Sequence, residues 1–262
     1  MEFKKEEEYM KIIKGFVIAF SIYSKIPVPQ FDWKEEDMQY HLCFFPLIGL
    51  IIGALEAGWF FLGNAVEISH LCKTLIAVAI PLLVTGGFHM DGFMDTMDAF
   101  HSYQDKEKKL EILKDPHCGA FAVIYGGVYL LAYAGFAYEV FAAGHILLIC
   151  PLFVLSRALS GLCAVNLPNA RKSGMLCAFT SGVQRRTATA ALALAGLAAA
   201  AGMVWMSPTA GGMAAAFAVV SALKYRRFAL AQFGGVTGDT SGFFLQLCEL
   251  CGLIGIWIGG LL

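Results

Sequence analysis

Long apolar runs separated by short polar stretches make up most of this chain. About 20 consecutive apolar helical residues cross the ~30 Å core of a bilayer. Residues 12–24 form a shorter apolar stretch, interrupted by Lys14 and followed by Pro27 and Pro29, which favours an interfacial or re-entrant helix over a span. The runs that approach spanning length are 43–62, 74–88, 118–138, 140–162, 188–206, 209–223 and 243–262. The pattern predicts an all-α, polytopic membrane helix bundle of about seven transmembrane helices, with residues 1–262 in a single domain.

Composition agrees with a membrane protein. The chain is 58% hydrophobic and 15% charged, with a mean hydropathy of +0.66, whereas soluble domains are about 45–50% apolar and about 25% charged. Its 19 basic and 20 acidic residues leave a net charge of −1, so no nucleic-acid partner is expected. Membrane lipid is the expected surrounding partner, and the sequence leaves assembly into a homo-oligomer open.

Lysine and arginine are concentrated in alternate connections between the apolar runs. Counted by connection from the N-terminal region to the C-terminus, they number six, one, four, none, four, none, three and none. Because these residues accumulate on the cytoplasmic side of a membrane, the alternation predicts an N-terminus inside and a C-terminus outside. The long connections at 85–117, 166–187 and 224–242 then face the cytoplasm, which is typical of an enzyme that works from one side.

The acidic segment at 85–117 carries the strongest chemical signal. Asp91, Asp95 and Asp98 stand at i, i+4 and i+7, so on a helix they fall within an arc of about 60°. Such like charges repel one another unless a cation neutralises them, and hard oxygen ligands favour Mg²⁺ or Mn²⁺. A solvated helix face is the alternative, but the intervening residues are apolar. A zinc site built from His89, Asp91, His101 and His117 is disfavoured because no HExxH-type spacing is present.

Further polar groups are expected on the same side. The segment 234–242 has four glycines, two threonines and one acid, a composition suited to a turn or to phosphate or metal binding. Arg157 lies within a span, where a charge lines a site, pairs with an acid or reaches the interface. Lys114 and Asp115 follow a predicted amphipathic helix at 106–115 and are either interfacial anchors or site residues. An acidic cluster, a glycine–hydroxyl segment and cations together suit phosphate chemistry.

These motifs resemble the cobalamin synthase family, the adenosylcobinamide-GDP ribazoletransferases. The resemblance rests on GGFHMDGFMDTMDAF at 86–100, KLEILKDPHCGAFAV at 109–123 and GGVTGDT at 234–240, in the family's order. IPVP at 26–29 and FPLIG at 45–49 fit its early segments. Ala99 stands where the family pattern has glycine, and 116–118 departs from a more usual small-polar and basic run.

The resemblance implies an enzyme of the bacterial cytoplasmic (inner) membrane, with its active site facing the cytoplasm. It would join adenosylcobinamide-GDP to α-ribazole or its 5′-phosphate, with release of GMP and dependence on Mg²⁺. The implied metal ligands are Asp91, Asp95 and Asp98, with one of them or His89 as proton acceptor. The implied substrate-binding residues are Lys114, Asp115, Arg157, Gly235, Thr237, Gly238 and Asp239.

Two other functions compete with this interpretation. A CDP-alcohol phosphotransferase also uses spaced membrane aspartates, but its pattern has Ala-Arg after the first Asp-Gly, where this chain has Phe93 and Met94. A cation-coupled transporter would place its carboxylates near the middle of the membrane, whereas this acidic segment follows a span. A transporter also often shows internal repeats, and none stands out in this sequence.

Overall fold

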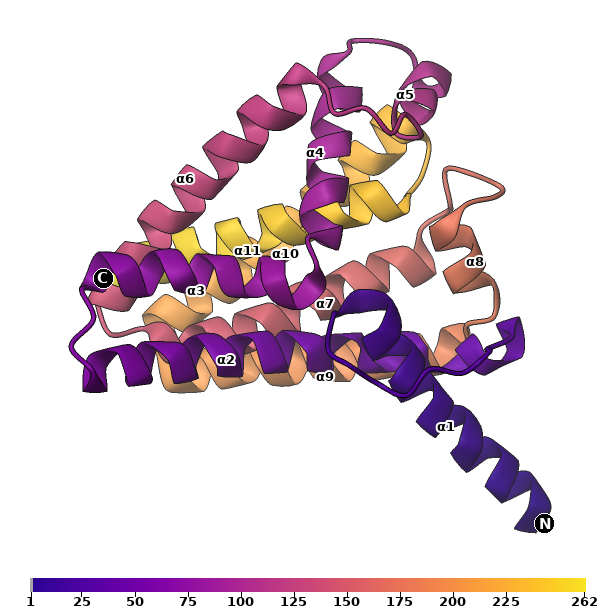
Figure 1. The fold of residues 1–262 in the computed structure, drawn as a ribbon, viewed down its shortest axis with the longest axis horizontal. Helices are drawn as coiled ribbons and strands as arrows, with labels where there is room; N and C mark the ends of the chain where they lie inside the picture. Colours follow the sequence, from indigo (N-terminus) through magenta and orange to yellow (C-terminus); the bar gives the residue numbers. More distant parts are fainter. Residues whose placement is uncertain (1) are drawn as a thin grey trace.

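The structure, a computed structural model, describes residues 2–262 and is entirely helical there apart from turns, loops and a single β-bridge (Figure 1). Its α-helices are α1 (Glu2–Tyr23), α2 (Phe45–Ala65), α3 (His70–Thr85), α4 (Phe88–His101), α5 (Lys106–Ile112), α6 (Ala120–Ala142), α7 (Ile149–Asn166), α8 (Met175–Ser181), α9 (Arg185–Met206), α10 (Pro208–Phe233) and α11 (Gly238–Gly260). Short 3₁₀ helices cover Glu35–Gln39 (η1), His41–Phe44 (η2) and Ile146–Leu148 (η3).

The predicted all-α membrane bundle is confirmed, with fewer spans than expected. Within residues 2–262, five helical segments are long and apolar enough to cross a membrane, namely those that include α2, α6, α7, α9 and α11. A sixth is reached only if α3 and α4, which meet at an angle of 93°, are counted as one broken span. The expected run at 74–88 lies mostly in α3, which has only 16 residues. The run at 209–223 lies in α10, which is long but is not among the five candidate spans.

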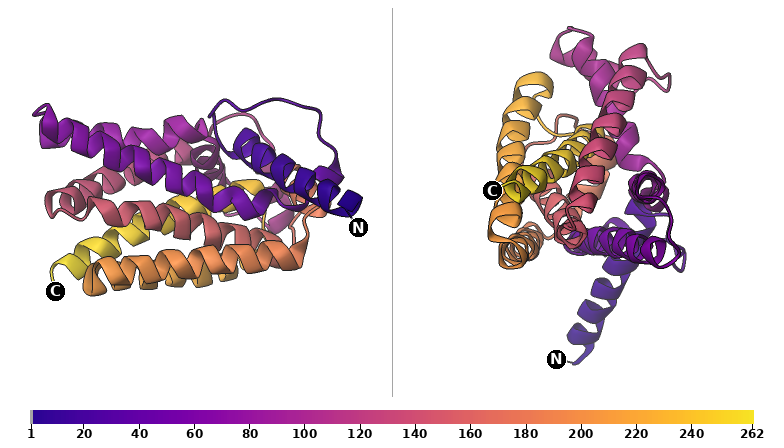
Figure 2. Two further views of the ribbon diagram at one scale, coloured as in Figure 1. Left: turned by 90° about the horizontal axis from the view of Figure 1, so that it is seen from below. Right: turned by 90° about the vertical axis from the view of Figure 1, so that its left-hand side faces the viewer.

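The helices α2, α3 and α9 run along one direction, α6 and α1 are inclined to them, and the connections differ between the two ends of the bundle (Figure 1). At one end the turns are tight, and a single residue, Ser207, separates α9 from α10. The other end carries α1, α8 and the segments around them, and the start of α1 and the end of α11 lie at opposite ends (Figure 1 and Figure 2). Residues 12–24, predicted to be interfacial or re-entrant, fall largely within α1, which is not among the spanning helices.

Close packing of α2 on α7 forms part of the interior. A Cβ atom at Gly49 would lie 2.3 Å from the carbonyl oxygen of Phe153, and one at Gly53 would lie 2.3 Å from the Cα of Cys150. Glycine is therefore required at both positions for the two backbones to approach this closely. The resulting contact holds the buried face of α7 against α2 and places Arg157 within the bundle.

A glycine pair turns the chain sharply between α3 and α4. Gly86 and Gly87 have φ of 65° and 78°, a region that residues with a Cβ atom rarely adopt. After the turn, α4 crosses the N-terminal half of α11 (Figure 1). A Cβ at Gly92 would lie 2.8 Å from the Cα of Asp239, and one at Gly242 would lie 2.7 Å from the carbonyl oxygen of His89. The two glycines let the acidic helix touch the backbone of the glycine–threonine segment.

The segment 224–242 is not the long loop that its charges suggested. Lys224, Arg226 and Arg227 lie on α10, which continues to Phe233, and only four residues connect it to α11. Their exposed side chains are compatible with a helix that runs beyond its apolar part. The expected amphipathic helix at 106–115 is present as α5, with Asp105 accepting a hydrogen bond from the backbone N–H of Lys108 at its start.

Candidate functional site

The three aspartates of α4 face different neighbours although they share one side of the helix. Asp91 is exposed and lies in the first turn, next to the Gly86–Gly87 bend. Asp95, one turn further on, is partly buried. Asp98 is turned toward the start of α6: the N–H of Gly119 donates to its Oδ2 over 2.7 Å and that of Ala122 donates to its Oδ1 over 2.9 Å. Asp98 therefore caps α6 across a gap of more than 20 residues, a role that no local pattern indicated.

Removal of this cap gives a first prediction. Asp98→Ala is expected to lower the free energy of unfolding by about 1–3 kcal/mol, because two backbone N–H groups of α6 lose a charged acceptor. The midpoint of thermal unfolding of the purified protein in detergent measures this change. Asp32→Ala, at an exposed aspartate, serves as control. Equal stabilities of the two variants would show that the cap contributes nothing.

Negative charge is concentrated around Asp95. Burial, reinforced by the carboxylates of Asp91, Asp239 and Asp98, raises the pKa of Asp95 to about 7. Asp239 belongs to the first turn of α11, so the cluster joins two helices that are far apart in sequence. Carboxylates that repel one another in this way attract a divalent cation, which neutralises their charge.

The segment between α10 and α11 is held by backbone contacts. Gly234 ends α10 with a φ of 77°. Val236 pairs with the segment that follows α7: its N–H donates to the carbonyl of Pro168 and its own carbonyl accepts from Ala170, each over 2.9 Å. A Cβ at Gly235 would lie 2.3 Å from the Pro168 oxygen, so only glycine permits this pairing. Gly235 is thus explained by packing, independently of any ligand.

Thr237 begins α11 as its N-cap. Its hydroxyl accepts a hydrogen bond from the N–H of Thr240, and the Thr240 hydroxyl in turn accepts from the N–H of Thr237. The Thr237 hydroxyl also lies 3.4 Å from Oδ2 of Asp239. This capping box fixes the first turn of α11, including Gly238 and Asp239, beside the α4 carboxylates.

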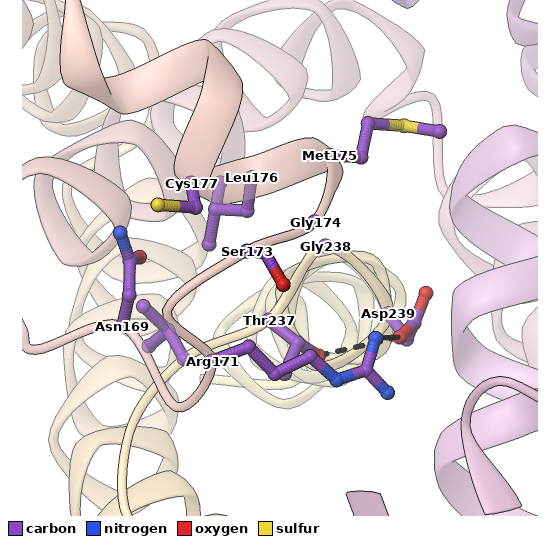
Figure 3. A pocket seen from close by; sticks show the side chains of 11 residues that line it. Asn169, Arg171, Ser173, Gly174, Met175, Leu176, Cys177, Thr237, Gly238 and Asp239 are labelled. Atoms are coloured by element: carbon purple, nitrogen blue, oxygen red, sulfur yellow. Dashed lines mark hydrogen bonds and ion pairs between the residues drawn. The ribbon is translucent and has the colours of Figure 1, made fainter. Parts of the chain in front are cut away.

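A cation and a small cavity lie next to this turn. Nη1 of Arg171 stands 3.9 Å from Oδ2 of Asp239, and Nη2 of Arg171 donates to the carbonyl of Leu110 on α5 over 2.7 Å. Both residues line a cavity of about 50 Å³ together with Thr237 and Gly238, and Figure 3 shows the Arg171 side chain reaching toward Asp239. Nε of Arg171 is buried without a hydrogen-bond partner. The loose ion pair and the unused N–H suit contact with an anion.

Lys114 and Asp115 lie in the exposed connection between α5 and α6. The carboxylate of Asp115 accepts hydrogen bonds from the backbone N–H and from the ring of His117, and these bonds lower the pKa of Asp115. The same connection continues to Gly119, whose N–H donates a hydrogen bond to Asp98. The structure therefore attaches this segment to the acidic helix through Asp98, and the substrate-binding role expected for Lys114 and Asp115 stays a prediction.

His89 is placed on the buried side of α4. The residue is 5% exposed, its ring contacts those of Phe45 and Phe88, and its Nδ1 has no hydrogen-bond partner. Asp91 is exposed and Asp95 partly buried, so both are more accessible to a substrate than His89, and the proton-accepting role considered for His89 stays a prediction. Within residues 2–262, His89 stays apart from the carboxylates it flanks in sequence.

Arg157 does not reach this site, and the expected contact with pyrophosphate is not supported. The side chain is 1% exposed and its Nη1 donates to Oε1 of Glu249 over 2.7 Å and to the carbonyl of Phe153 over 3.1 Å. Glu249 is equally buried, and Glu56 is close enough to interact with both charges. Of the alternatives open for a charge within a span, pairing with an acid is the one the structure shows.

A magnesium ion fits these residues in the way that it commonly binds. Within the described chain, no three His, Cys, Asp or Glu side chains are gathered closely enough to enclose a metal ion. Mg²⁺, however, is usually held by one or two carboxylates together with waters and the phosphates of a substrate. Asp91, Asp95 and Asp239 supply such carboxylates, and Asp98 is engaged with α6. The expected ligand set of Asp91, Asp95 and Asp98 stays a prediction.

Arg171 is a residue for which the sequence indicates no partner. It is one of the four basic residues of the connection at 166–187, which were counted only as a topology signal. The pairing of 168–170 with 235–236 brings it to Asp239. Its position next to two asparagines and a proline was the available signal for a bend at this point.

Comparisons with known proteins agree with the resemblance seen in the motifs. The profile of the cobalamin-5-phosphate synthase family matches residues 15–257. An adenosylcobinamide-GDP ribazoletransferase of Lachnoclostridium phytofermentans is 42% identical over 241 residues, 92% of each chain. Proteins of the same name from Geobacillus sp. (32% identity over 252 residues, 93% of this chain and 95% of the relative) and Clostridium botulinum (30% over 250 residues, 92% and 96%) are also similar. No solved structure matches the chain. With its motifs in order and nearly its whole length covered, the chain belongs to the cobalamin-5-phosphate synthase family.

Proposed function

We propose that this protein is an adenosylcobinamide-GDP ribazoletransferase that joins α-ribazole, or its 5′-phosphate, to the cobinamide half of adenosylcobinamide-GDP. A hydroxyl of the acceptor forms a bond to the phosphorus attached to cobinamide, the bond from that phosphorus to the GMP phosphate breaks, and GMP leaves. The product is adenosylcobalamin or its 5′-phosphate. The family membership supports this activity, and the arrangement of α4 and α11 supplies residues for it.

One observation carries the proposal: the acidic helix α4 lies in backbone contact with the glycine–threonine turn that begins α11. Phosphoryl transfer requires positioning and charge balance more than covalent chemistry. At this crossing, Asp91, Asp95 and Asp239 would hold Mg²⁺. When bound, the ion neutralises charge on the phosphates and orients them.

The other roles fall to groups around the crossing. Arg171, with its unpartnered Nε, would hold a phosphate oxygen beside Gly238. One of the outward carboxylates, Asp91 or Asp95, would accept the proton of the attacking hydroxyl. The α5–α6 connection with Lys114 and Asp115 would cover the substrate from the side of Gly119.

The site is proposed to face the cytoplasm of the bacterial inner membrane. The lysines and arginines of the connections lie at the end of the bundle that carries α1, α5 and α8. At the opposite end, the connections at 143–148 and at Ser207 contain none. A cation-coupled transporter is disfavoured by the family membership, which covers nearly the whole chain.

The test is a direct assay with purified protein in detergent or lipid vesicles. Adenosylcobinamide-GDP, α-ribazole and Mg²⁺ are expected to yield adenosylcobalamin and one GMP per product, and α-ribazole 5′-phosphate is expected to yield adenosylcobalamin 5′-phosphate. Chelation of Mg²⁺ by EDTA should stop turnover and re-addition should restore it, because the carboxylates alone repel the phosphates. Absence of both corrinoid product and GMP with each acceptor would refute the activity. Turnover that persists in EDTA would refute the metal.

A further inference from the structure

A second cavity, lined by both polar and apolar residues, lies against the start of the acidic helix. It has a volume of about 530 Å³ and lies between the end of α1 and the α3–α4 turn. Its polar lining consists of Ser21, Ser24, Lys25, Thr85, Gly87 and Asp91. We refer to it as the Lys25 cavity. The cavity is about tenfold larger than the one at Arg171, whose volume is about 50 Å³.

Lys25 is held in this cavity by a glycine. Its backbone N–H donates to the carbonyl of Val84 over 2.7 Å, which ties the end of α1 to the end of α3. Its side chain then runs over Gly86: a Cβ there would lie 2.4 Å from Cε, 2.8 Å from Cγ and 3.1 Å from Cδ. Gly86 therefore makes the bend and also leaves room for the lysine stem. Lys25 is an exposed residue, so its ammonium group is accessible to a ligand in solution.

The charge of Lys25 has no partner in the described chain. Among residues 2–262, no carboxylate lies within 4.0 Å of its ammonium group, although Asp91 lines the same cavity. A lysine and an aspartate that line one cavity without closing on each other leave space for a ligand between them. An anion next to the lysine and a cation next to the aspartate would satisfy both groups.

The acidic cluster is thus flanked by two cations that line separate cavities. Arg171 stands 3.9 Å from Asp239 of α11, and Lys25 lines a cavity that Asp91 of α4 also lines. Asp95 interacts electrostatically with both aspartates. A reaction that brings together two large polar substrates needs a subsite on each side of the reacting phosphate, and phosphate groups are the anions that these substrates carry.

We propose that Lys25 is a substrate-binding residue whose ammonium group contacts a phosphate group of one substrate in the Lys25 cavity. The inference rests on the proposed function. Two substrates could supply this phosphate: the guanosine diphosphate part of the donor, or the 5′-phosphate of the acceptor. The ligand chemistry is the same in both cases, and the kinetics of three substrates distinguish them.

The experiment compares wild type with Lys25→Met, which keeps the stem over Gly86 and removes the charge. KM is measured for adenosylcobinamide-GDP, for α-ribazole 5′-phosphate and for α-ribazole, each with saturating co-substrate and Mg²⁺. Loss of a charge-assisted contact raises KM for the substrate that carries the phosphate by about 10- to 100-fold. KM for α-ribazole, which has no phosphate, stays unchanged. Calorimetric binding of GMP and of α-ribazole 5′-phosphate gives the same comparison without turnover.

Controls separate this role from a general effect of charge. Lys34→Gln removes an exposed lysine outside the Lys25 cavity and should leave every KM unchanged. Lys25→Arg should recover most of the affinity. A rise for the donor alone assigns the cavity to guanosine diphosphate, and a rise for the phosphorylated acceptor alone assigns it to the acceptor. Unchanged constants in Lys25→Met, or an equal rise for all three substrates, overturn the proposal. Inactivity of the wild type would instead refute the proposed function.

Discussion

Asp95→Asn is expected to lower the rate of GMP release by about 10²–10⁴-fold, because a carboxylate at a metal ion contributes several kcal/mol to stabilising a transition state. Asp95 is the residue on which the charges of Asp91, Asp98 and Asp239 all act. Its replacement should therefore have the opposite effect on the fold. In the absence of Mg²⁺ the variant should unfold at the same or a higher temperature than the wild type, since one of several repelling charges is gone.

The rate of GMP release and the unfolding temperature together distinguish a functional role of Asp95 from a structural one. Steady-state GMP release and thermal unfolding, both in detergent, are measured for Asp95→Asn and for Asp32→Asn as an exposed control. The control should match the wild type in both. Activity above one tenth of the wild-type rate in Asp95→Asn would contradict the proposed site. A marked loss of stability would show that Asp95 supports the fold.

Arg157→Met is expected to lower the free energy of unfolding by about 3–5 kcal/mol, because removal of one partner of a buried ion pair leaves an uncompensated charge. The group that loses its cationic partner is Glu249, which is 2% exposed, and the nearby Glu56 is 1% exposed. Thermal unfolding in detergent and the yield of folded protein in the membrane measure the effect. Arg186→Met, at an exposed arginine, should change neither.

A double variant tests whether the cost arises from the pair itself. Arg157→Met combined with Glu249→Met removes both charges, and its stability should lie well above that of Arg157→Met alone. If the losses of the single variants instead add, the two residues act independently. The assay of GMP release, normalised to folded protein, should show a similar rate in Arg157→Met and wild type, because Arg157 is buried away from the substrate groups.

Local patterns predicted the helices and the identity of the reactive segment. The apolar residues between the aspartates of α4 indicated an amphipathic helix, and the structure confirms it, with Phe93 buried against α11 and Asp91 exposed. The segment at 234–240 was expected on the same side as the aspartates, and it lies against them. Both predictions depend on neighbours within a few residues, which a periodic pattern records directly.

Contacts between distant residues could not be predicted in the same way. Glu249 lies 92 positions from Arg157, and Gly119 lies 21 positions from Asp98. A single sequence gives no indication of which acid faces which base or which helix end needs a cap. The extent of α10 was missed for a related reason: Lys224, Arg226 and Arg227 resemble loop residues, yet α10 continues through them because their long side chains can reach water from a helix.

The crossing of α4 and α11 bears on how the protein is made. Asp91 and Asp239 are 148 positions apart (239 − 91), so the acidic cluster requires contacts of long sequence separation. Chains emerge from the ribosome N-terminal end first, at about 5–20 residues per second. For roughly 7–30 seconds, calculated from that rate, α4 is present without α11 to cover its apolar face. The proposed site is therefore complete only when α11 docks, and a chain that ends before α11 is expected to be inactive.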